Sequence, residues 1–403
     1  MDHARADALA ARSHLAAHGW IARDSESFRH LPPPDLGVWL GQLDAAALAE
    51  PLTASGWQLA PSDQAAVEAH WLDAADPAQR GELLAGLRLP ADDPAAPLAW
   101  AHRALVRDGL RLRVGPSGAD PVLLQLRRVP AGSVEAPLLV IELLPGARCV
   151  LVEVHDLQTE HPSAGCVQNL QVHVRAGEGA SLRHLRVTLP RAQDQIAHDV
   201  HIRLERDASY EHALLAGGSR YHLQRSVLEL ARDGALARSA AVLLAADSTL
   251  DQQITAQHGA PKTTSSVETL ALGAGSARLV ANAQSTIAPG SDDAQTRQRL
   301  AGIPTRGQPK LVLRPHLEIN HDQVQAAHGA TWGALPQEAL FLARQRGLDE
   351  ASAKAMIIHG LAAAVLTRAF EGADVLEATG IDAILSAAVA RHLAGEAREQ
   401  SHG

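Results

Sequence analysis

The stretch Val172-His-Val-Arg-Ala-Gly-Glu-Gly-Ala-Ser-Leu182 alternates apolar and polar residues, turns at two glycines and then resumes with small and apolar residues. The pattern returns in Val200-His-Ile-Arg-Leu-Glu-Arg-Asp-Ala-Ser-Tyr210 and again in Val227-Leu-Glu-Leu-Ala-Arg-Asp-Gly-Ala-Leu236. Alternation with a period of two is typical of β-strands, because successive side chains of a strand point to opposite faces. These segments therefore predict a repeated unit of two short strands joined by a turn.

The length of the repeat follows from its turn positions. Gly179, Asp207 and Gly234 lie at equivalent places and are 28 and 27 residues apart. Helical spacing is absent from this part of the chain, so each unit is expected to contain strands alone. Two looser copies show the same pattern: Ile141 to Val150, turning at Gly146, and Leu270 to Val280, turning at Gly275.

A strand repeat of this length is typical of a parallel β-solenoid, whose coils stack equivalent apolar side chains on one another. The side chains expected to stack are those of Val172, Val200 and Val227. A sandwich of antiparallel hairpins is the alternative, with strands recurring about every ten residues. We favour a mainly β protein, a right-handed parallel β-helix flanked by helical regions at both ends.

Three regions are expected along the chain. Residues 1–105 are rich in alanine and leucine and are interrupted by prolines, which predicts short helices and loops. Residues 106–333 form the predicted β-helix core. Residues 334–403 form a predicted C-terminal helical domain, with part of its surface free for another protein.

The C-terminal domain carries clear helix boundaries. Pro336 stands where a first-turn proline belongs, and Gly347 is placed to end the helix that follows. Asp349 is expected to cap a second helix, since a side-chain oxygen there can accept a free backbone N–H. A third helix is predicted from about Asp382 to Leu393.

Composition excludes several classes of function. The net charge of -9 gives no basic surplus for a phosphate backbone, so nucleic acid is not expected as a partner. Cys149 and Cys166 are the two cysteines, too few for a disulfide framework, which fits the reducing cytoplasm. No export signal or membrane span is expected. Walker A, G-x-G-x-x-G and G-x-S-x-G sequences are also absent.

One dense polar patch, Arg314 to Thr331, contains His316, His321 and His328. Imidazole nitrogens can hold a divalent metal, but spacings of five and seven match no standard zinc motif. Strand alternation would also place His316 and His321 on opposite faces. From the residues alone, a capped solenoid end with a turn at Gly329 remains the alternative to a metal site.

The patch nevertheless resembles the SufB/SufD family. The similar residues are Leu317-Glu-Ile, then Asp322-x-Val324, then His328-Gly-Ala-Thr331-x-Gly333, then Ala339-Leu-Phe-Leu-x-x-x-Arg346-Gly347. Each fragment is short, but their order and spacing are kept. With weaker matches upstream, the similarity covers roughly residues 105 to 370.

The resemblance implies a non-catalytic scaffold subunit of an ATPase-driven complex for iron–sulfur cluster assembly. A SufB-like subunit would pair with it through the β-helix, and a SufC-like ABC ATPase would dock on its C-terminal helices. The nascent cluster or its iron would be shared with the partner, and FADH2 is implied as a cofactor of the complex as a whole. The residues expected to bind the ATPase are Phe341, Arg346, Met356, Ile357 and Leu361.

Within the family the SufD-like branch fits better than SufB, because the chain is short, has few cysteines and carries His328. His328 is the expected interface ligand for cluster or metal, and His316 and His321 are weaker candidates. Ala326 replaces a cysteine common in the family, so that thiol can have no role here.

Two alternatives remain open, a SufB-type main scaffold and a β-helix carbohydrate-active enzyme. The second is disfavoured because aromatic residues are nearly absent from residues 110 to 310.

Overall fold

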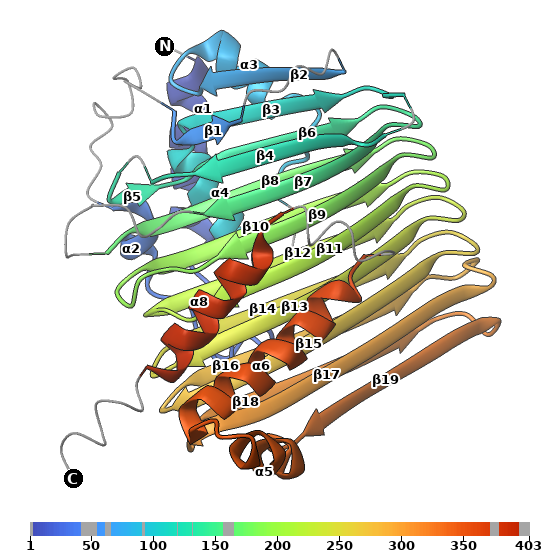
Figure 1. Ribbon diagram of the computed structural model, residues 1–403. Coiled ribbons are helices and arrows are strands. Elements are labelled where there is room, and N and C mark those ends of the chain that lie inside the picture. The colour runs from blue at the N-terminus through green and yellow to red at the C-terminus, as the bar shows by residue number, and fades with distance from the viewer. Residues whose placement is uncertain are drawn as a thin grey trace.

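In the computed structural model the chain forms two long β-sheets that lie face to face (Figure 1). The structure describes residues 3–41, 55–60, 66–90, 93–118, 120–130, 132–155, 165–370 and 379–394. Over these residues sheet A has nine strands and sheet B has ten. The tenth strand of sheet B is the short β5 (Val134–Glu135), which pairs with β8 outside the main strand order given below.

The strands of each sheet are given in spatial order. Sheet A consists of β1 (Trp57–Leu59), β4 (Val122–Arg128), β7 (Arg148–His155), β9 (Ser181–Thr188), β11 (Ser209–Gly217), β13 (Leu236–Ala246), β15 (Thr264–Gly275), β17 (Ala294–Gly307) and β19 (Val324–Trp332). Sheet B consists of β18 (Lys310–Ile319), β16 (Arg278–Ile287), β14 (Thr249–His258), β12 (Tyr221–Leu230), β10 (Gln195–Leu204), β8 (Val167–Ala176), β6 (Leu138–Leu143), β3 (Asp108–Val114) and β2 (Val67–Asp73).

From β6 onward the chain alternates between the sheets, so that one coil contributes one strand to each. Strand β8 pairs in parallel with β10, and β9 pairs in parallel with β11. Such pairing between successive coils confirms the parallel β-solenoid and rules out the sandwich of hairpins, whose neighbours would be antiparallel. Apolar side chains from both sheets fill the space between them and form the main core.

The expected stacking of three valines is correct for two of them. Val172 and Val200 are register partners on β8 and β10, and both are buried. Val227 lies one residue out of register, because Ser226 is the partner of Val200. The cause is one extra residue between the end of β12 and its turn. The sequence comparison aligned the repeats by their turns, so it placed the residues of β12 one position out of register.

The turn positions read from the sequence adopt the left-handed conformation. The φ angles are 64° at Gly179, 52° at Asp207 and 72° at Gly234. The N–H of Gly179 donates to Arg206 O at 2.8 Å, which ties one turn to the next. The assignment of Gly275 to the same row is wrong. Gly275 is the last residue of β15, at the opposite edge of the coil, and the residue equivalent to Gly234 is Lys262, with φ 56°.

Helices cover the outer faces of both sheets. The C-terminal helices α6 and α8 lie across sheet A, as Figure 1 shows, and bury an apolar face that includes Val187, Leu215 and Val242. The N-terminal helices α2 and α4 lie against sheet B, where Trp39 and Leu98 are buried. The helices are α1 (His3–His18), α2 (Leu36–Leu40), α3 (Pro77–Leu84), α4 (Ala96–Leu105), α5 (Gln337–Gln345), α6 (Glu350–Thr367) and α8 (Ile381–Leu393).

The predicted helix boundaries agree with the C-terminal helices. Pro336 is the residue before α5, Gly347 has φ 91° just beyond it, and Asp349 Oδ1 accepts the N–H of Ser352 at 2.8 Å. The N-terminal region differs from the expectation of helices and loops, because it also holds β1 and β2. No helix in the described part of the chain is long and apolar enough to cross a membrane.

The two ends of the solenoid are built differently. At the N-terminal end β1 pairs antiparallel with β4, and β2 pairs antiparallel with β3. These reversed strands, with α3 packed beside β2, close that end. At the other end β18 and β19 are the last strands of their sheets, and each pairs on one side among the described residues.

Candidate functional site

The polar patch singled out from the sequence lies on the open end of the solenoid. Its residues belong to β18 and β19 and to the turn between them. Most side chains of β19 are exposed, and Trp332 at its end is 61% exposed. Gly329 lies within β19, so the expectation of a glycine turn there is wrong. Among the described residues, a methyl group at Gly329 would meet no atom within 4 Å outside its chain neighbours.

The structure places the three histidines apart. His316 is on β18 at a position whose side chain faces out of the solenoid, since the neighbouring Leu313 faces the core. His321 lies in the turn, where its Nε2 is 2.7 Å from Asp292 Oδ1. His328 is on β19. Among the described residues no three His, Cys, Asp or Glu side chains form a group that could hold a metal ion.

His328 continues a row of side chains that face the interior of the solenoid. Its register partner on β17 is Gln298, and the row runs back through Val267 and Ser239 to His212. The earlier members are buried, whereas His328 is exposed because no further strand covers it. The His328 imidazole is therefore accessible at the open end.

The open end also exposes backbone groups. The N–H of Gly333 donates to Gly302 O on β17 at 3.0 Å. Alternate residues of a strand bond to the same side, so Ala327 also points its N–H toward β17. The N–H and C=O groups of Ala326 and His328 therefore point away from the sheet. This row of free groups is a template for another strand.

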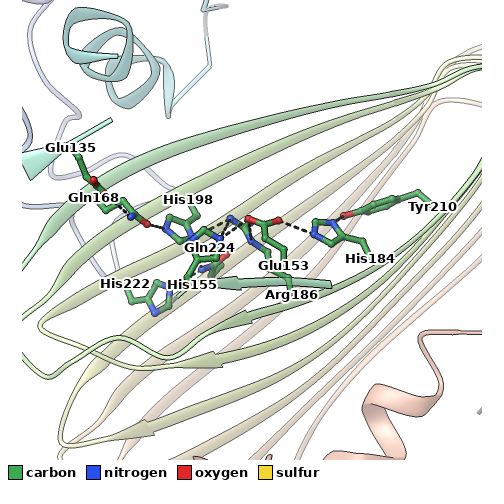
Figure 2. Close-up of polar contacts among 10 residues, drawn as sticks. All are labelled: Glu135, Glu153, His155, Gln168, His184, Arg186, His198, Tyr210, His222 and Gln224. Atoms are coloured by element: carbon green, nitrogen blue, oxygen red, sulfur yellow. Dashed lines mark hydrogen bonds and ion pairs between the residues drawn. The ribbon is translucent and has the colours of Figure 1, made fainter. Parts of the chain in front are cut away.

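A second polar cluster is buried between the sheets in the middle of the solenoid, and Figure 2 shows it. At its centre Glu153 Oε2 accepts from His184 Nε2 at 2.8 Å, and Glu153 Oε1 lies 2.5 Å from His155 Nε2. Arg186 Nε is 3.4 Å from Glu153 Oε1. All four side chains are buried, so the charges of Glu153 and Arg186 neutralise each other away from water.

Hydrogen bonds extend this cluster in a fixed direction. Arg186 Nη2 donates to His198 Nδ1 at 3.2 Å, and His198 Nε2 then donates to Gln168 Oε1 at 2.5 Å. Gln168 Nε2 donates in turn to Glu135 Oε1 at 2.5 Å. On the other side the hydroxyl of Tyr210 lies 3.0 Å from His184 Nδ1. His198 accepts from Arg186 on one ring nitrogen and donates to Gln168 from the other, so this chain of bonds needs a neutral His198.

The protonation states agree with this pattern. Burial alone raises the pKa of Glu153, but the charge of Arg186 and the bonds from the two histidines outweigh it and hold that pKa well below its usual range. Burial lowers the pKa of His155 to about 4 and that of His222 to about 3, because the charged imidazolium is poorly solvated there. The pKa of His198 is also lowered, chiefly by burial.

Sequence reasoning did not find this cluster. One of its members, His222, bonds through Nδ1 to Gly217 O inside the solenoid at 2.6 Å. The available signal was a set of polar residues recurring at equivalent positions of adjacent coils. Alternation alone cannot tell which face of a strand is inside when helices cover the other face.

The residues expected to bind the ATPase fall into two groups. Phe341 on α5 and Met356 on α6 are 59% and 52% exposed. Arg346 follows α5 and is also exposed. Ile357 and Leu361 are partly buried against the apolar cluster between α6, α8 and sheet A. The first group is free to contact another protein, and the second mainly holds α6 in place.

The fold and the open end define a β-solenoid protein with one closed and one uncapped end. A family model for the SUF system FeS cluster assembly, SufBD core domain, matches residues 128–361. The chain therefore belongs to the SufBD family of the SUF system, which confirms the family resemblance.

The chain is also similar to the iron-sulfur cluster assembly protein SufD of Escherichia coli (strain K12), with 34% identity over 89 residues. That match covers 22% of this chain and 19% of the relative.

Proposed function

We propose that this chain is a SufD-like, non-catalytic scaffold subunit for iron–sulfur cluster assembly in the cytoplasm. The observation that carries the proposal is the position of the family residues His328-Gly-Ala-Thr331 on β19, the uncapped edge strand. A surface that presents free backbone groups and an unpartnered imidazole fits a partner that completes both the sheet and a ligand set.

The partner at this end is a SufB-like subunit. Its strands would extend sheets A and B beyond β19 and β18, and exposed apolar side chains such as Trp332 and Ile319 would be covered. His328 would supply one imidazole nitrogen to the nascent cluster or its iron, and the partner would supply thiolate ligands. FADH2 belongs to the complex as a whole, and no chemical step is assigned to this chain alone.

The two cysteines favour a SufD-like role over that of the main scaffold. Cys149 and Cys166 are both buried. Burial raises the pKa of Cys149 to about 12 and also raises that of Cys166. A thiol must ionise and be reachable to accept sulfur, so neither cysteine is suited to carry a persulfide.

The second partner is a SufC-like ABC ATPase, docked on α5 and the start of α6. Phe341 and Met356 would be the apolar contacts and Arg346 a polar one. Removing the helices is a poor test, because it would expose the apolar outer face of sheet A. Substitutions confined to exposed side chains separate docking from folding.

The experiment is co-purification of the tagged full chain with SufB-like and SufC-like proteins expressed together. We expect Phe341→Ser combined with Met356→Ser to reduce ATPase recovery at least about tenfold, since exposed aromatic anchors dominate such interfaces. Leu89→Ser, at a residue 62% exposed in the N-terminal region, is the matched control and should change nothing.

His328→Ala should leave both partners bound and lower the iron and sulfide content of the complex. Normal cluster loading in that variant would contradict the ligand role. Undiminished ATPase recovery with the double variant would contradict the docking site.

A further inference from the structure

Gln298 is a buried polar side chain on β17, the strand next to the open edge, and it lies directly below His328. It is 2% exposed, and its Oε1 has no hydrogen-bond partner among the described residues. A buried acceptor left without a donor destabilises the fold, because it has lost its hydrogen bonds to water. Such an atom at the edge of an incomplete site indicates a donor that the separate chain does not yet supply.

The orientation of the Gln298 amide is fixed by its other contacts. Its Nε2 donates to the carbonyl oxygen of His316 at 3.0 Å and to Ser285 Oγ at 2.8 Å. The carbonyl oxygen of His316 can only accept, so the nitrogen and not the oxygen of the amide must face it. Oε1 is therefore the free atom, and the amide also joins β17 of sheet A to β18 of sheet B.

A chain of hydroxyl groups holds this amide from behind. Ser285 Oγ is 2.8 Å from Thr296 Oγ1, which is 2.8 Å from Ser265 Oγ. Ser265 Oγ is in turn 2.8 Å from His258 Nε2. All of these side chains are buried. The position of Gln298 is thus set by the interior, independently of anything bound at the open end.

His328, the register partner of Gln298, carries a ring N–H that could serve as this donor. Register partners in adjacent strands lie about 4.8 Å apart and point to the same face, which for this pair is the interior face. No hydrogen bond joins the ring of His328 to another described residue. A histidine that donates one ring N–H to a fixed acceptor keeps a single tautomer and directs its other nitrogen away from that acceptor.

We propose that Gln298 is the positioning residue for His328: its Oε1 accepts a ring N–H of His328 and turns the other ring nitrogen toward a divalent iron ion at the open end. This inference rests on the proposed function, since it assumes that His328 is an iron ligand. It adds a residue inside the solenoid, which never touches the metal, to the machinery of the interface.

The test uses the full chain in complex with its SufB-like partner. Nitrogen NMR shifts of the His328 ring report its tautomer, and anaerobic titration with Fe²⁺ alone gives a dissociation constant. In the unsubstituted complex we expect one dominant neutral tautomer. Gln298→Met keeps the length of the side chain and removes the acceptor, so it should mix the tautomers and weaken Fe²⁺ binding about tenfold.

The matched control is Gln252→Met. Gln252 is equally buried, and its Oε1 accepts from Thr269 Oγ1 on neighbouring β15, away from His328. This variant should lose a similar amount of stability but keep the tautomer and the Fe²⁺ affinity.

An even tautomer mixture in the unsubstituted complex, or unchanged Fe²⁺ affinity in Gln298→Met, would overturn the positioning role. Unchanged affinity in His328→Ala would instead overturn the ligand role on which it rests. The two failures are therefore distinguishable.

Discussion

The two ends of the solenoid differ in how their terminal strands are covered. At the closed end Asp108 Oδ2 accepts from the N–H of Gly56 at 2.8 Å and pairs with buried Arg128, whose Nη2 also lies 2.7 Å from Glu135 Oε2. Antiparallel strands then end the stacking. At the open end no antiparallel strand covers β18 or β19 in the described residues, and Trp332 stays exposed.

The difference indicates where the molecule is complete and where it is not. Stacked repeats expose apolar and backbone groups at any unprotected end, so solenoids need terminal caps. Two strands and a helix cover one end of the solenoid, whereas the edge strands at the other end are uncovered among the described residues. A partner that supplies the missing layer is the simplest reason, and three measurements can weaken or sharpen this contrast.

The largest expected effect is a loss of stability at low pH, caused by buried histidines in the half of the solenoid nearer the closed end. His155, His198 and His222 are buried with lowered pKa values, so the unfolded chain takes up protons below about pH 6.5 that the folded chain refuses. Stability therefore falls as pH falls from about 6.5. At pH 5 His155 and His222 each cost on the order of 2 kcal/mol, and His198 adds to the loss in the same direction.

Urea unfolding at pH 7.5 and pH 5 measures this loss. The variant His222→Leu should show a smaller pH slope than the unsubstituted chain, because it lacks one of the buried histidines. Hydrogen exchange at pH 5 should show β10 and β12 losing protection before β16 does. Equal stability at the two pH values would mean that the interior histidines are not held neutral.

The next effect concerns the buried ion pair of the closed end. Asp108→Ala leaves Arg128 with one of its two carboxylates and removes the acceptor for Gly56, so we expect a loss of about 3–5 kcal/mol in unfolding free energy. Glu318→Ala at the open end should cost less than about 0.5 kcal/mol. Chemical denaturation of both variants measures the two losses of unfolding free energy. Equal losses would contradict the difference proposed between the two ends.

The smallest effect separates folding from pairing at the open end. Ala327 directs its N–H into the sheet, so Ala327→Pro should lose a ladder bond and about 1–3 kcal/mol of stability. Ala326 directs its N–H outward, so Ala326→Pro should leave the isolated chain within about 1 kcal/mol. It should nevertheless weaken binding to the SufB-like partner at least about tenfold. Full partner binding by Ala326→Pro would show that this edge is not extended by another strand.

Much of the fold was predictable because it repeats. Gly179, Asp207 and Gly234 gave the coil length, since a left-handed turn restricts the residues that fit there. The strand register was less accessible. Val227 was misplaced because coils differ by single residues between strand and turn, and such differences leave no mark on the alternation of apolar residues.

The site was predictable in part, and the limit has a physical cause. The motif around His328 identified a region, but its spacing could not reveal that His328 faces inward while His316 faces outward. Gln298 was invisible in the sequence. Its significance depends on an oxygen left without a donor, and hydrogen-bond satisfaction is a property of the folded chain alone.

The edges of the coils are also where the chain can gain or lose residues. Where β17 pairs with β15 it contains one extra residue, and the structure absorbs it as a bulge after Pro304. The extra Thr305 is held by bonds of its Oγ1 to Gly273 O at 3.0 Å and to His392 Nε2 at 2.8 Å. Insertions at coil edges can thus be accepted without moving the coils that follow. Over evolutionary time, codons can be gained or lost at these edges while the open end keeps its shape.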